Sequence, residues 1–345
     1  MKTSVVILNY NTKEYLKRFL PGLIASCKGL DAEVIVADNA SADGSAEMMA
    51  GEFPEIRLIT FKENYGFTGG YNRALEQVEA DYYVLINSDV EVPEGWLKVL
   101  TDWMDSHPEC GACGPKLISY HQRDTFEYAG AAGGLLDRYG YPFCRGRILG
   151  EIESDNGQYN DVRDIFWATG ACMFIRSKLY IGSGGLDEDY FAHMEEIDIC
   201  WRLKNQGYRI SVVPQSTVYH VGGGTLPNNN PHKLYLNYRN NLYLLYKNLP
   251  ARGFVRNIIV RMILDGISMG LYLIKLQLRF FWAVPRAHFS FYRNIGKLRA
   301  KRKALQAVRK VEYHNERYKH SIVADYYIRK IRHFSRLKPK RFKGK

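Results

Sequence analysis

Two groups of carboxylates in this sequence have the types and spacing for metal binding and for acid–base chemistry. In the first group, Asn87, Asp89 and Glu91 follow an apolar run at alternate positions. An extended backbone turns such side chains to one face. Oxygen ligands in that arrangement suit Mg²⁺ or Mn²⁺, and bridging phosphates would complete the coordination. Pro93 leaves an alternative open, in which the same acids form the first turn of a helix.

The second group is Glu195, Glu196 and Asp198, which share one helical turn. Repulsion between like charges raises carboxyl pKa values, so one of these groups can act as a general base. Arg202, four residues after Asp198, would relieve part of that repulsion on an ordinary surface helix. His220 ends an apolar run before glycines, and it is either a structural histidine or a metal ligand.

Two further segments suit a nucleotide. In Val36–Ser45, Asp38 ends an apolar run before a polar turn, where it can accept hydrogen bonds from a base or a ribose. The same residues would also make an ordinary turn and helix cap. In Glu63–Ala74, glycines permit close backbone approach, and Asn72 and Arg73 stand at the start of a predicted helix. Neither segment matches a Walker loop or a dinucleotide fingerprint, which argues against an ATPase and a nicotinamide enzyme.

Alternating strands and helices are needed to position these groups. Four apolar runs are predicted as strands: Val5–Leu8, Val34–Ala37, Ile56–Phe61 and Tyr82–Ile86. Helical patterns separate them, so we predict an α/β fold with a mostly parallel sheet. Ligands bind beyond the carboxyl ends of such strands, which is where Asn9, Asp38 and Asp89 fall.

The chain divides by pattern and by charge. We predict a domain over residues 1–230, with a nucleotide-binding half at about 1–115 and an acceptor half at about 116–230, followed by a helical, basic region at 231–345. The net charge is +12, but residues 252–345 hold 25 Lys and Arg against 4 Asp and Glu, whereas residues 1–251 hold 23 against 32. A uniformly basic protein is therefore excluded.

The basic region is expected to lie on a membrane surface rather than to cross it. Charged residues, among them Arg261 and Asp265, interrupt the apolar stretch around Met262–Ile274. Aromatic residues interleaved with arginines from Arg279 to Arg293 are typical of an interfacial helix on anionic lipid.

The six cysteines are scattered, which favours reduced core thiols in a cytoplasmic protein. Cys110 and Cys113 have CxxC spacing without a second pair for zinc. The apolar run at the N-terminus is too short for a signal peptide.

Taken in this order and spacing, the segments from Ser4 to about Leu249 resemble the family 2 glycosyltransferases with a GT-A fold, especially their bacterial rhamnosyltransferase-like branch. The motifs that carry the resemblance are NYN at 9–11, DNAS-DGS at 38–45, the N-GF--G-N- loop at 64–72, the DxD-type motif at 87–89, TGA at 169–171 and the acidic-doublet helix at 195–202. The sequence departs from the family pattern at Asn87, the first position of the DxD-type motif, and at Glu196, where the family usually has Asp.

The resemblance implies a Rossmann-like GT-A sheet with a helical, basic C-terminal extension, and an inverting, metal-dependent hexosyl transfer. Glu196, or else Glu195, would deprotonate an acceptor hydroxyl that attacks the anomeric carbon of a nucleotide-activated sugar. A divalent metal, Mg²⁺ or Mn²⁺, would bind Asp89 and His220. Donor binding is assigned to Asn9, Tyr10, Asn11, Asp38, Asn39, Asn64, Gly66, Asn72, Arg73, Asn87 and Ser88, and the acceptor side to Gly170, Ala171, Asp198 and Arg202.

The implied partners are a nucleotide-sugar donor, a saccharide or lipid-linked acceptor of cell-surface glycan assembly, and the inner face of the plasma membrane. No nucleic acid is expected, because the body is acidic and carries no RNA-binding signature. Two alternatives stay open: a protein whose basic tail binds nucleic acid or another polyanion, and a sugar-phosphate nucleotidyltransferase. The latter would need a phosphate loop directly after the first strand, and NYNTKEY is not one.

Overall fold

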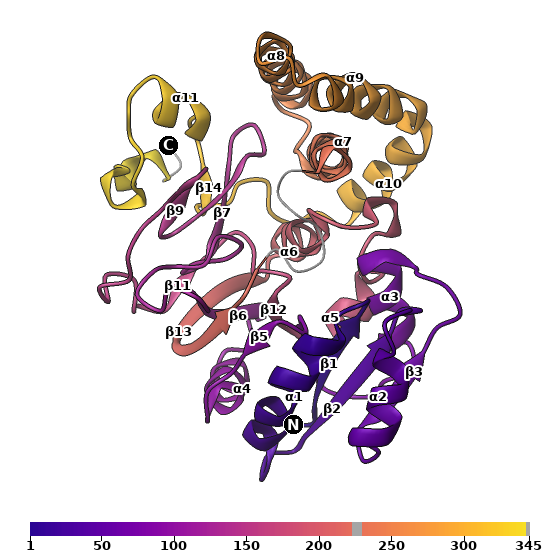
Figure 1. Ribbon diagram of the computed structural model, residues 1–345. Helices are drawn as coiled ribbons and strands as arrows, with labels where there is room; N and C mark the ends of the chain where they lie inside the picture. Colours follow the sequence, from indigo (N-terminus) through magenta and orange to yellow (C-terminus); the bar gives the residue numbers. More distant parts are fainter. Residues whose placement is uncertain (223–229, 343–345) are drawn as a thin grey trace.

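The computed structural model describes residues 1–222 and 230–342 (Figure 1). Its central sheet is built from β1 (Thr3–Asn9), β2 (Ala32–Asp38), β3 (Arg57–Thr60), β4 (Tyr82–Ile86), β5 (Val90–Glu91), β6 (Cys110–Ser119), β11 (Arg163–Asp164), β12 (Cys172–Arg176) and β13 (Arg209–His220). Among the described residues these nine strands follow the order β11-β13-β6-β12-β4-β1-β2-β3, with β5 paired to β13.

The sheet has a parallel half and a mixed half. β1 pairs in parallel with β2 and β4, and β2 pairs in parallel with β3, as the four apolar runs predict. β12 is antiparallel to both β4 and β6. The alternating α/β pattern ends with β4, so the sheet can continue only by strands of the other direction or by longer crossovers.

Helices cover both faces of the sheet. They are α1 (Lys13–Cys27), α2 (Ser45–Glu52), α3 (Gly66–Leu75), α4 (Trp96–Ser106), α5 (Ser177–Gly182) and α6 (Glu195–Asn205), with a 3₁₀ turn η1 (Glu188–Tyr190) before α6. Val5 and Ile7 of β1 share a core with α1, α2 and α4, whereas Val6 between them shares a core with α3, α5 and α6. This two-residue period produces a three-layer sandwich.

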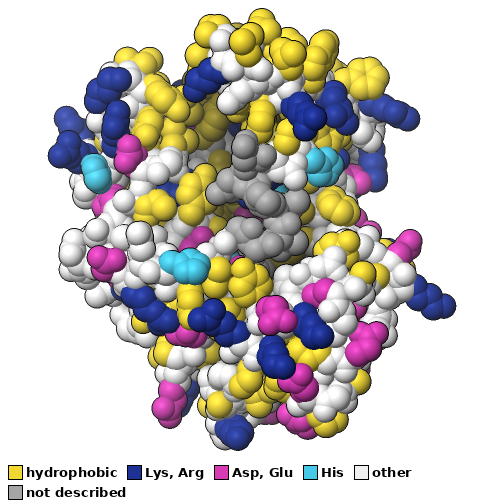
Figure 2. Space-filling model, in the orientation of Figure 1, with side chains coloured by type: hydrophobic (Ala, Val, Ile, Leu, Met, Phe, Trp, Pro, Cys, Tyr) yellow, Lys and Arg dark blue, Asp and Glu magenta, His cyan; other side chains and the backbone are white. Residues whose placement is uncertain are grey.

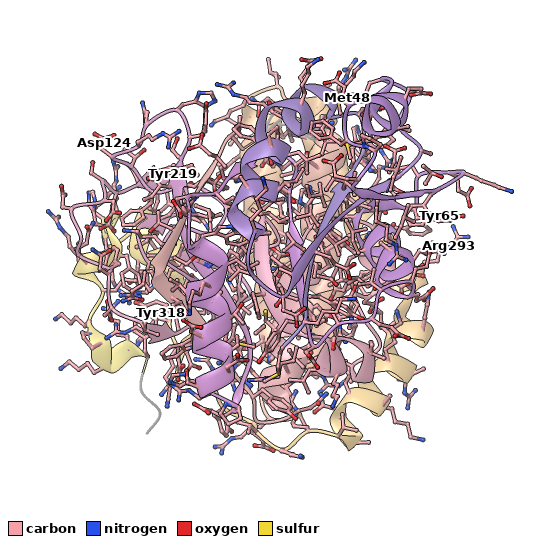
Figure 3. All side chains as sticks on the ribbon, turned by 90° about the horizontal axis from the view of Figure 1, so that it is seen from below. Met48, Tyr65, Asp124, Tyr219, Arg293 and Tyr318 are labelled. Carbon is pink, nitrogen blue, oxygen red and sulfur yellow. The ribbon has the colours of Figure 1, made fainter. Side chains whose placement is uncertain are left out.

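A second, smaller sheet joins distant parts of the chain. It consists of β7 (Gly134–Asp137), β8 (Pro142–Cys144), β9 (Arg147–Ile148), β10 (Glu151–Ile152) and β14 (Arg317–Tyr318), in the order β10-β9-β8-β7-β14. Tyr318 is fully buried against Phe143, and it lies beside the yellow C-terminal segment (Figure 3). The basic region therefore adds a strand to this sheet as well as helices.

The remaining helices are α7 (Pro231–Asn248), α8 (Phe254–Ile274), α9 (Leu278–Arg293), α10 (Ile295–Ala307) and α11 (Ile322–Tyr327), followed by the 3₁₀ turns η2 (Phe334–Arg336) and η3 (Pro339–Arg341). α8 and α9 lie together at one end of the molecule, away from the parallel half of the sheet (Figure 1). α7 packs on α6, so elements from the two sides of the predicted boundary at residue 230 share one core. That boundary stays a prediction.

α8 is the one described helix that is long and apolar enough to cross a membrane, by length and composition alone. Only 22% of its apolar window is buried. Arg261 and Asp265 lie on its inner face, where they are buried and paired with each other. Its outer face exposes Val255, Ile259, Ile263, Ile267 and Leu271. The expectation that this segment lies on a membrane surface stays a prediction.

The prediction of core cysteines is confirmed. All six thiols are free and buried, and burial raises the pKa of Cys113 well above its ordinary value. These side chains act as small apolar core residues rather than as nucleophiles.

Candidate active site

A cavity of about 860 Å³ opens beyond the carboxyl ends of β1, β2 and β4. It extends past the start of α6 to the inner sides of α7 and α8. The structure brings these predicted site residues to its wall: Tyr10, Asn39, Asn64, Gly66, Asn87, Ser88, Asp89, Gly170, Ala171, Glu195, Glu196 and His220. Asp89 of the first group and Glu195 and Glu196 of the second therefore face one cavity, whereas Glu91 pairs with Arg123 at 2.8 Å outside it.

Other predicted donor-binding residues lie behind the cavity wall and shape its loops. Asn9 donates from Nδ2 to Asp38 Oδ1 at 2.7 Å, and Asp38 Oδ2 accepts from the Ser41 amide at 3.0 Å. Asn11 accepts from the Ala42 amide at 2.7 Å. In the structure Asn9, Asn11 and Asp38 hold the turn that follows β2, and their polar groups are engaged there.

Asn72 and Arg73 also lie outside the cavity wall. Asn72 Oδ1 accepts from the Tyr180 hydroxyl at 2.7 Å, which joins α3 to α5. Arg73 pairs with Glu188 at 3.1 Å and covers the ring of Tyr65 at 3.9 Å. The start of α3 was expected to present these donors to an anion, but both side chains point to neighbouring elements of the protein instead.

Asp198 and Arg202 are not on the acceptor side of the cavity; they belong to a buried ion-pair network. Asp198 is fully buried and accepts from Arg202 Nε at 2.8 Å, Lys247 Nζ at 3.0 Å and Asn248 Nδ2 at 2.7 Å. Burial alone would raise the pKa of Asp198, but Lys247 and Arg202 hold it below its usual range. This network ties α6 to α7, and the i to i+4 spacing on α6 serves packing.

Unlike Asp198, Glu195 and Glu196 form no ion pair with any residue that the structure describes. They open α6 directly after Met194, whose φ of 74° turns the chain into the cavity. Among the described residues, the Oε2 atom of each is buried without a hydrogen-bond partner. Burial and the charge of Glu196 raise the pKa of Glu195 well above its usual range, and burial raises the pKa of Glu196 to about 7.

The surroundings of the two groups suggest different roles. Glu195 is 5% exposed, and burial and the charge of Glu196 favour its protonated form, which can donate a hydrogen bond. Glu196 is half-buried and ionises near neutral pH, which suits a group that accepts a proton.

Asp89 and His220 meet although 131 residues separate them. β5 runs antiparallel to β13, and the pairing of Val90 with His220 places the two side chains together. His220 Nε2 lies 3.1 Å from Asp89 Oδ1, and its Nδ1 lies 3.3 Å from Glu127 Oε1. Burial opposes the charge on the ring, but the two carboxylates raise the pKa of His220 to about 10.

Glu127 is a site residue that the sequence did not reveal. It is buried and sits within a Gly-rich stretch that has no motif or periodic pattern. Its Oε2 accepts from the Ala129 amide at 2.5 Å. Only the packing of this loop against the end of β13 brings it to His220.

Asp89 and His220 could hold a divalent metal once the ring of His220, whose pKa of about 10 keeps it charged here, gives up a proton. A carboxylate oxygen and an imidazole nitrogen are accepted by Mn²⁺, and by Mg²⁺ chiefly through the oxygen. In the described ranges, no three His, Cys, Asp or Glu side chains converge on a point that a metal ion could occupy. Asp89 and His220 would hold the metal, and a bound ligand or water would add to its coordination.

Comparison with known proteins adds a family and a fold. The model of the family described as "Glycosyl transferase family 2" matches residues 4–180. The N-acetylglucosaminyl-diphospho-decaprenol L-rhamnosyltransferase of Mycobacterium tuberculosis is 27% identical over 234 residues, which cover 63% of this chain and 75% of that protein. The low-salt glycan biosynthesis hexosyltransferase Agl10 of Haloferax volcanii is 23% identical over 60% of this chain and 63% of its own length.

Two solved structures share the fold at low sequence identity. S. aureus TarS 1–349 in complex with UDP-GlcNAc aligns with a TM-score of 0.54 at 15% identity, covering 91% of this chain and 94% of that one. GalNAc-T7 with UDP, GalNAc and Mn²⁺ aligns with a TM-score of 0.57 at 14% identity, covering 72% of this chain and 48% of that one. Both likenesses concern the architecture of the sheet and its helices.

Proposed function

Because the chain belongs to glycosyl transferase family 2, we propose that it moves a hexosyl group from a nucleotide-diphosphate donor to an acceptor hydroxyl, with inversion and with the help of a divalent metal. The predicted family and the GT-A architecture are confirmed, and the chain is a glycosyltransferase. Membership in this family also removes the basis for the nucleotidyltransferase alternative.

One observation carries the proposed mechanism. The Oε2 atom of Glu196 has no hydrogen-bond partner among the described residues, and the side chain faces the same cavity as the Asp89–His220 pair. Glu196 would take the proton of the acceptor hydroxyl while that oxygen bonds to the anomeric carbon and the bond to the diphosphate breaks on the opposite face. The protonated Glu195 beside it would hold the acceptor by a hydrogen bond.

Asp89 and His220 are the residues proposed to hold the metal. When bound, a divalent ion supplies positive charge that offsets the charge of the departing diphosphate. GalNAc-T7, which shares the fold, was crystallised with Mn²⁺, and this supports a divalent metal as the ion.

The donor would lie at the end of the cavity formed by the loops after β1, β2 and β3. Asn39 donates to Asn64 Oδ1 and to the Gly66 carbonyl, and so fixes the entry to α3. Gly66 has a φ of +70°, and a Cβ there would meet the ring of Phe191 at 2.5 Å. A side chain at position 66 would therefore push Phe191, another wall residue, into the donor end.

We also propose that α8 and α9 lie in the plane of a cytoplasmic membrane surface. Apolar side chains gather over these two helices, with Lys and Arg side chains around them (Figure 2). On α9 and the turn before it, Leu276, Leu278, Trp282 and Phe289 are exposed next to the exposed cations Arg279 and Arg286. This composition suits an anionic interface. A lipid-linked acceptor, as named for the rhamnosyltransferase relative, would be presented there.

The donor is testable by binding. A panel of nucleotide sugars should include one that binds in the presence of Mn²⁺, measured by calorimetry. Asp89→Ala should abolish the metal-dependent part of that binding. Unchanged binding by this variant would contradict the assignment of Asp89.

The membrane proposal has its own test. Wild type should sediment with phosphatidylglycerol vesicles and less with phosphatidylcholine vesicles, and Ile263→Asp with Ile267→Asp should remove the interaction. Retention of RNA on a filter, with no vesicle binding, would support the polyanion alternative instead.

A further inference from the structure

The cavity has a second charged end, which the proposed transfer chemistry leaves without a role. Beyond Glu195 and Glu196, its wall carries the cations Arg147, Lys233 and Arg261. They come from three separate elements: β9, α7 and α8. This end is remote in the chain from the loops assigned to the donor.

Arg147 is a buried guanidinium without a carboxylate partner. It is 4% exposed, and none of the ion pairs among the described residues includes it. Nη1 donates to the Leu149 carbonyl at 3.1 Å, Nη2 contacts Cys144 Sγ at 3.4 Å, and Nε has no acceptor. The guanidinium lies 4.4 Å from the ring centre of Tyr128, another wall residue. Burying such a charge unpaired is costly, and a bound anion would compensate it.

A neighbouring arginine shows that pairing was possible in this hairpin. Arg145 is 2% exposed, and its guanidinium pairs with Asp161 outside the cavity wall. Arg145 is therefore neutralised by Asp161, a partly exposed carboxylate outside the cavity. Arg147, which lines the cavity, has no such partner among the described residues.

Arg261 is held in place from α8. Its Nε pairs with Asp265 at 2.7 Å, Nη1 donates to Asn241, and the guanidinium covers the ring of Tyr141 at 4.2 Å. Lys233, half-buried on α7, lines the same end. No acidic side chain of the described residues lines this end beyond the Glu195–Glu196 pair.

α8 connects this end of the cavity to the surface. The helix presents Arg261 inward, and one strip of apolar side chains outward, including Ile259 and Ile263. If a phosphate in the cavity binds Arg261, the apolar outer face of α8 lies about one helix diameter away from it, about 10 Å. A molecule with both an anionic group and an apolar chain fits this pair of surfaces.

We propose that Arg147, Lys233 and Arg261 form a subsite for the phosphate or diphosphate of a lipid-linked acceptor. The proposal rests on the proposed function, because it names the class of acceptor for that site. Guanidinium groups bind phosphate oxygens through paired N–H donors, and an ammonium group adds a compact charge. The acceptor's sugar hydroxyl would then extend from the phosphate toward Glu196.

The test uses the full chain in EDTA, so that metal-dependent donor binding is silent. Geranyl diphosphate, inorganic pyrophosphate and geraniol are titrated by calorimetry. Geranyl diphosphate should bind more tightly than either of the others. Equal binding of pyrophosphate would identify a free-phosphate site and overturn the lipid-linked assignment, and equal binding of geraniol would overturn the anion site.

Variants then locate the subsite. Arg147→Gln and Lys233→Gln should each weaken geranyl diphosphate binding by roughly tenfold. The matched control Arg145→Gln, in the same hairpin, should leave binding unchanged. Unchanged binding by Arg147→Gln and Lys233→Gln, or an equal loss in Arg145→Gln, would overturn the proposal. Lys233→Gln carries the test if the buried Arg147 variant fails to fold.

The two binding measurements distinguish a wrong phosphate subsite from a wrong transferase mechanism. Absence of metal-dependent nucleotide-sugar binding, with geranyl diphosphate binding intact, would refute the transferase mechanism alone. The reverse result would refute the subsite alone.

Discussion

Two acidic pairs in and before α6 have opposite electrostatic environments. Glu195 and Glu196 face the cavity and form no ion pair among the described residues, and their pKa values are raised. Asp187 and Asp198 lie on the side covered by α7 and α10, where Lys247 bonds to both, and their pKa values are lowered despite burial. All four side chains are carboxylates, so the charged group itself does not explain the difference. What distinguishes them is whether the basic part of the chain covers them.

Several positive charges of the C-terminal region are engaged within the protein. Lys301 pairs with Asp187 and Asp189. Arg302 donates to the Tyr246 carbonyl at 2.6 Å, and Arg309 donates to the Asn248 carbonyl. These cations hold the tail on the acidic body, so a membrane would meet only the others. The charge asymmetry of the sequence is partly an internal attraction.

The largest effect should follow from removing the unpaired carboxylate. Glu196→Gln is expected to reduce transfer by roughly 10²–10⁴-fold, which is the usual contribution of a general base, while leaving donor binding intact. Glu195→Gln should retain most activity, since burial favours the uncharged form of this carboxyl and an amide is also uncharged. Steady-state rates from pH 5 to 9 would test both, and wild type should lose activity below about pH 7 as Glu196 takes up a proton. Full turnover by Glu196→Gln would disprove its role.

Removing a carboxylate from the Asp187–Asp198 pair should lower stability rather than activity. Asp198→Asn leaves Arg202 and Lys247 buried without their shared carboxylate, and should lower the free energy of unfolding by about 3–5 kcal/mol. Denaturant titration followed by circular dichroism measures it. A variant as stable as wild type would show that the network contributes little to the attachment of α7.

The free energy of unfolding should depend on pH in opposite directions for the glutamate pair and the aspartate pair. Glu196 has a folded pKa of about 7, above its unfolded value of 4.5. Its contribution is therefore complete below pH 4.5 and is lost as the pH rises through 7, a change of up to about 3 kcal/mol. Glu196→Gln should then be more stable than wild type at pH 8 and similar at pH 4.5, as thermal melts can show. A less stable variant at pH 8 would contradict the raised pKa.

The aspartates should act in the other direction. The folded pKa values of Asp187 and Asp198 lie below the unfolded value of 3.8. Their contribution is present above pH 3.8 and is lost as the pH falls further. Asp198→Asn should therefore flatten the acid limb of a stability curve measured below pH 5, and an unchanged acid limb would speak against the lowered pKa.

The smallest effect is expected from the exposed ion pair between Lys297 and Asp189. Lys297 pairs with Asp189, but its side chain is 59% exposed. Lys297→Ala should change the free energy of unfolding by less than about 1 kcal/mol and leave transfer unchanged. A loss comparable to that of Asp198→Asn would show that the ion pairs act as one cooperative network.

Much of the donor end was predictable because its signals are local. Continuous apolar runs mark the buried strands β1, β2 and β4, and polar residues directly after parallel strands must meet at one edge of the sheet. Asn39, Ser88 and Asp89 reach the cavity for that reason. Asn72 and Arg73 do not, because a helix start has several faces and the sequence does not say which of them the next element covers.

By itself, the sequence determined the family, the parallel half of the sheet and an acidic doublet at a helix start, because each depends on residues near one another in the chain. Only the tertiary structure decided that Glu127 and Asp89 flank His220, that Asp198 is neutralised by Lys247, and that Arg147 is not neutralised by any described carboxylate. The reason is that charge and burial depend on which distant segments come into contact. A carboxylate or guanidinium becomes reactive, structural or ligand-binding according to the partner that the fold brings to it.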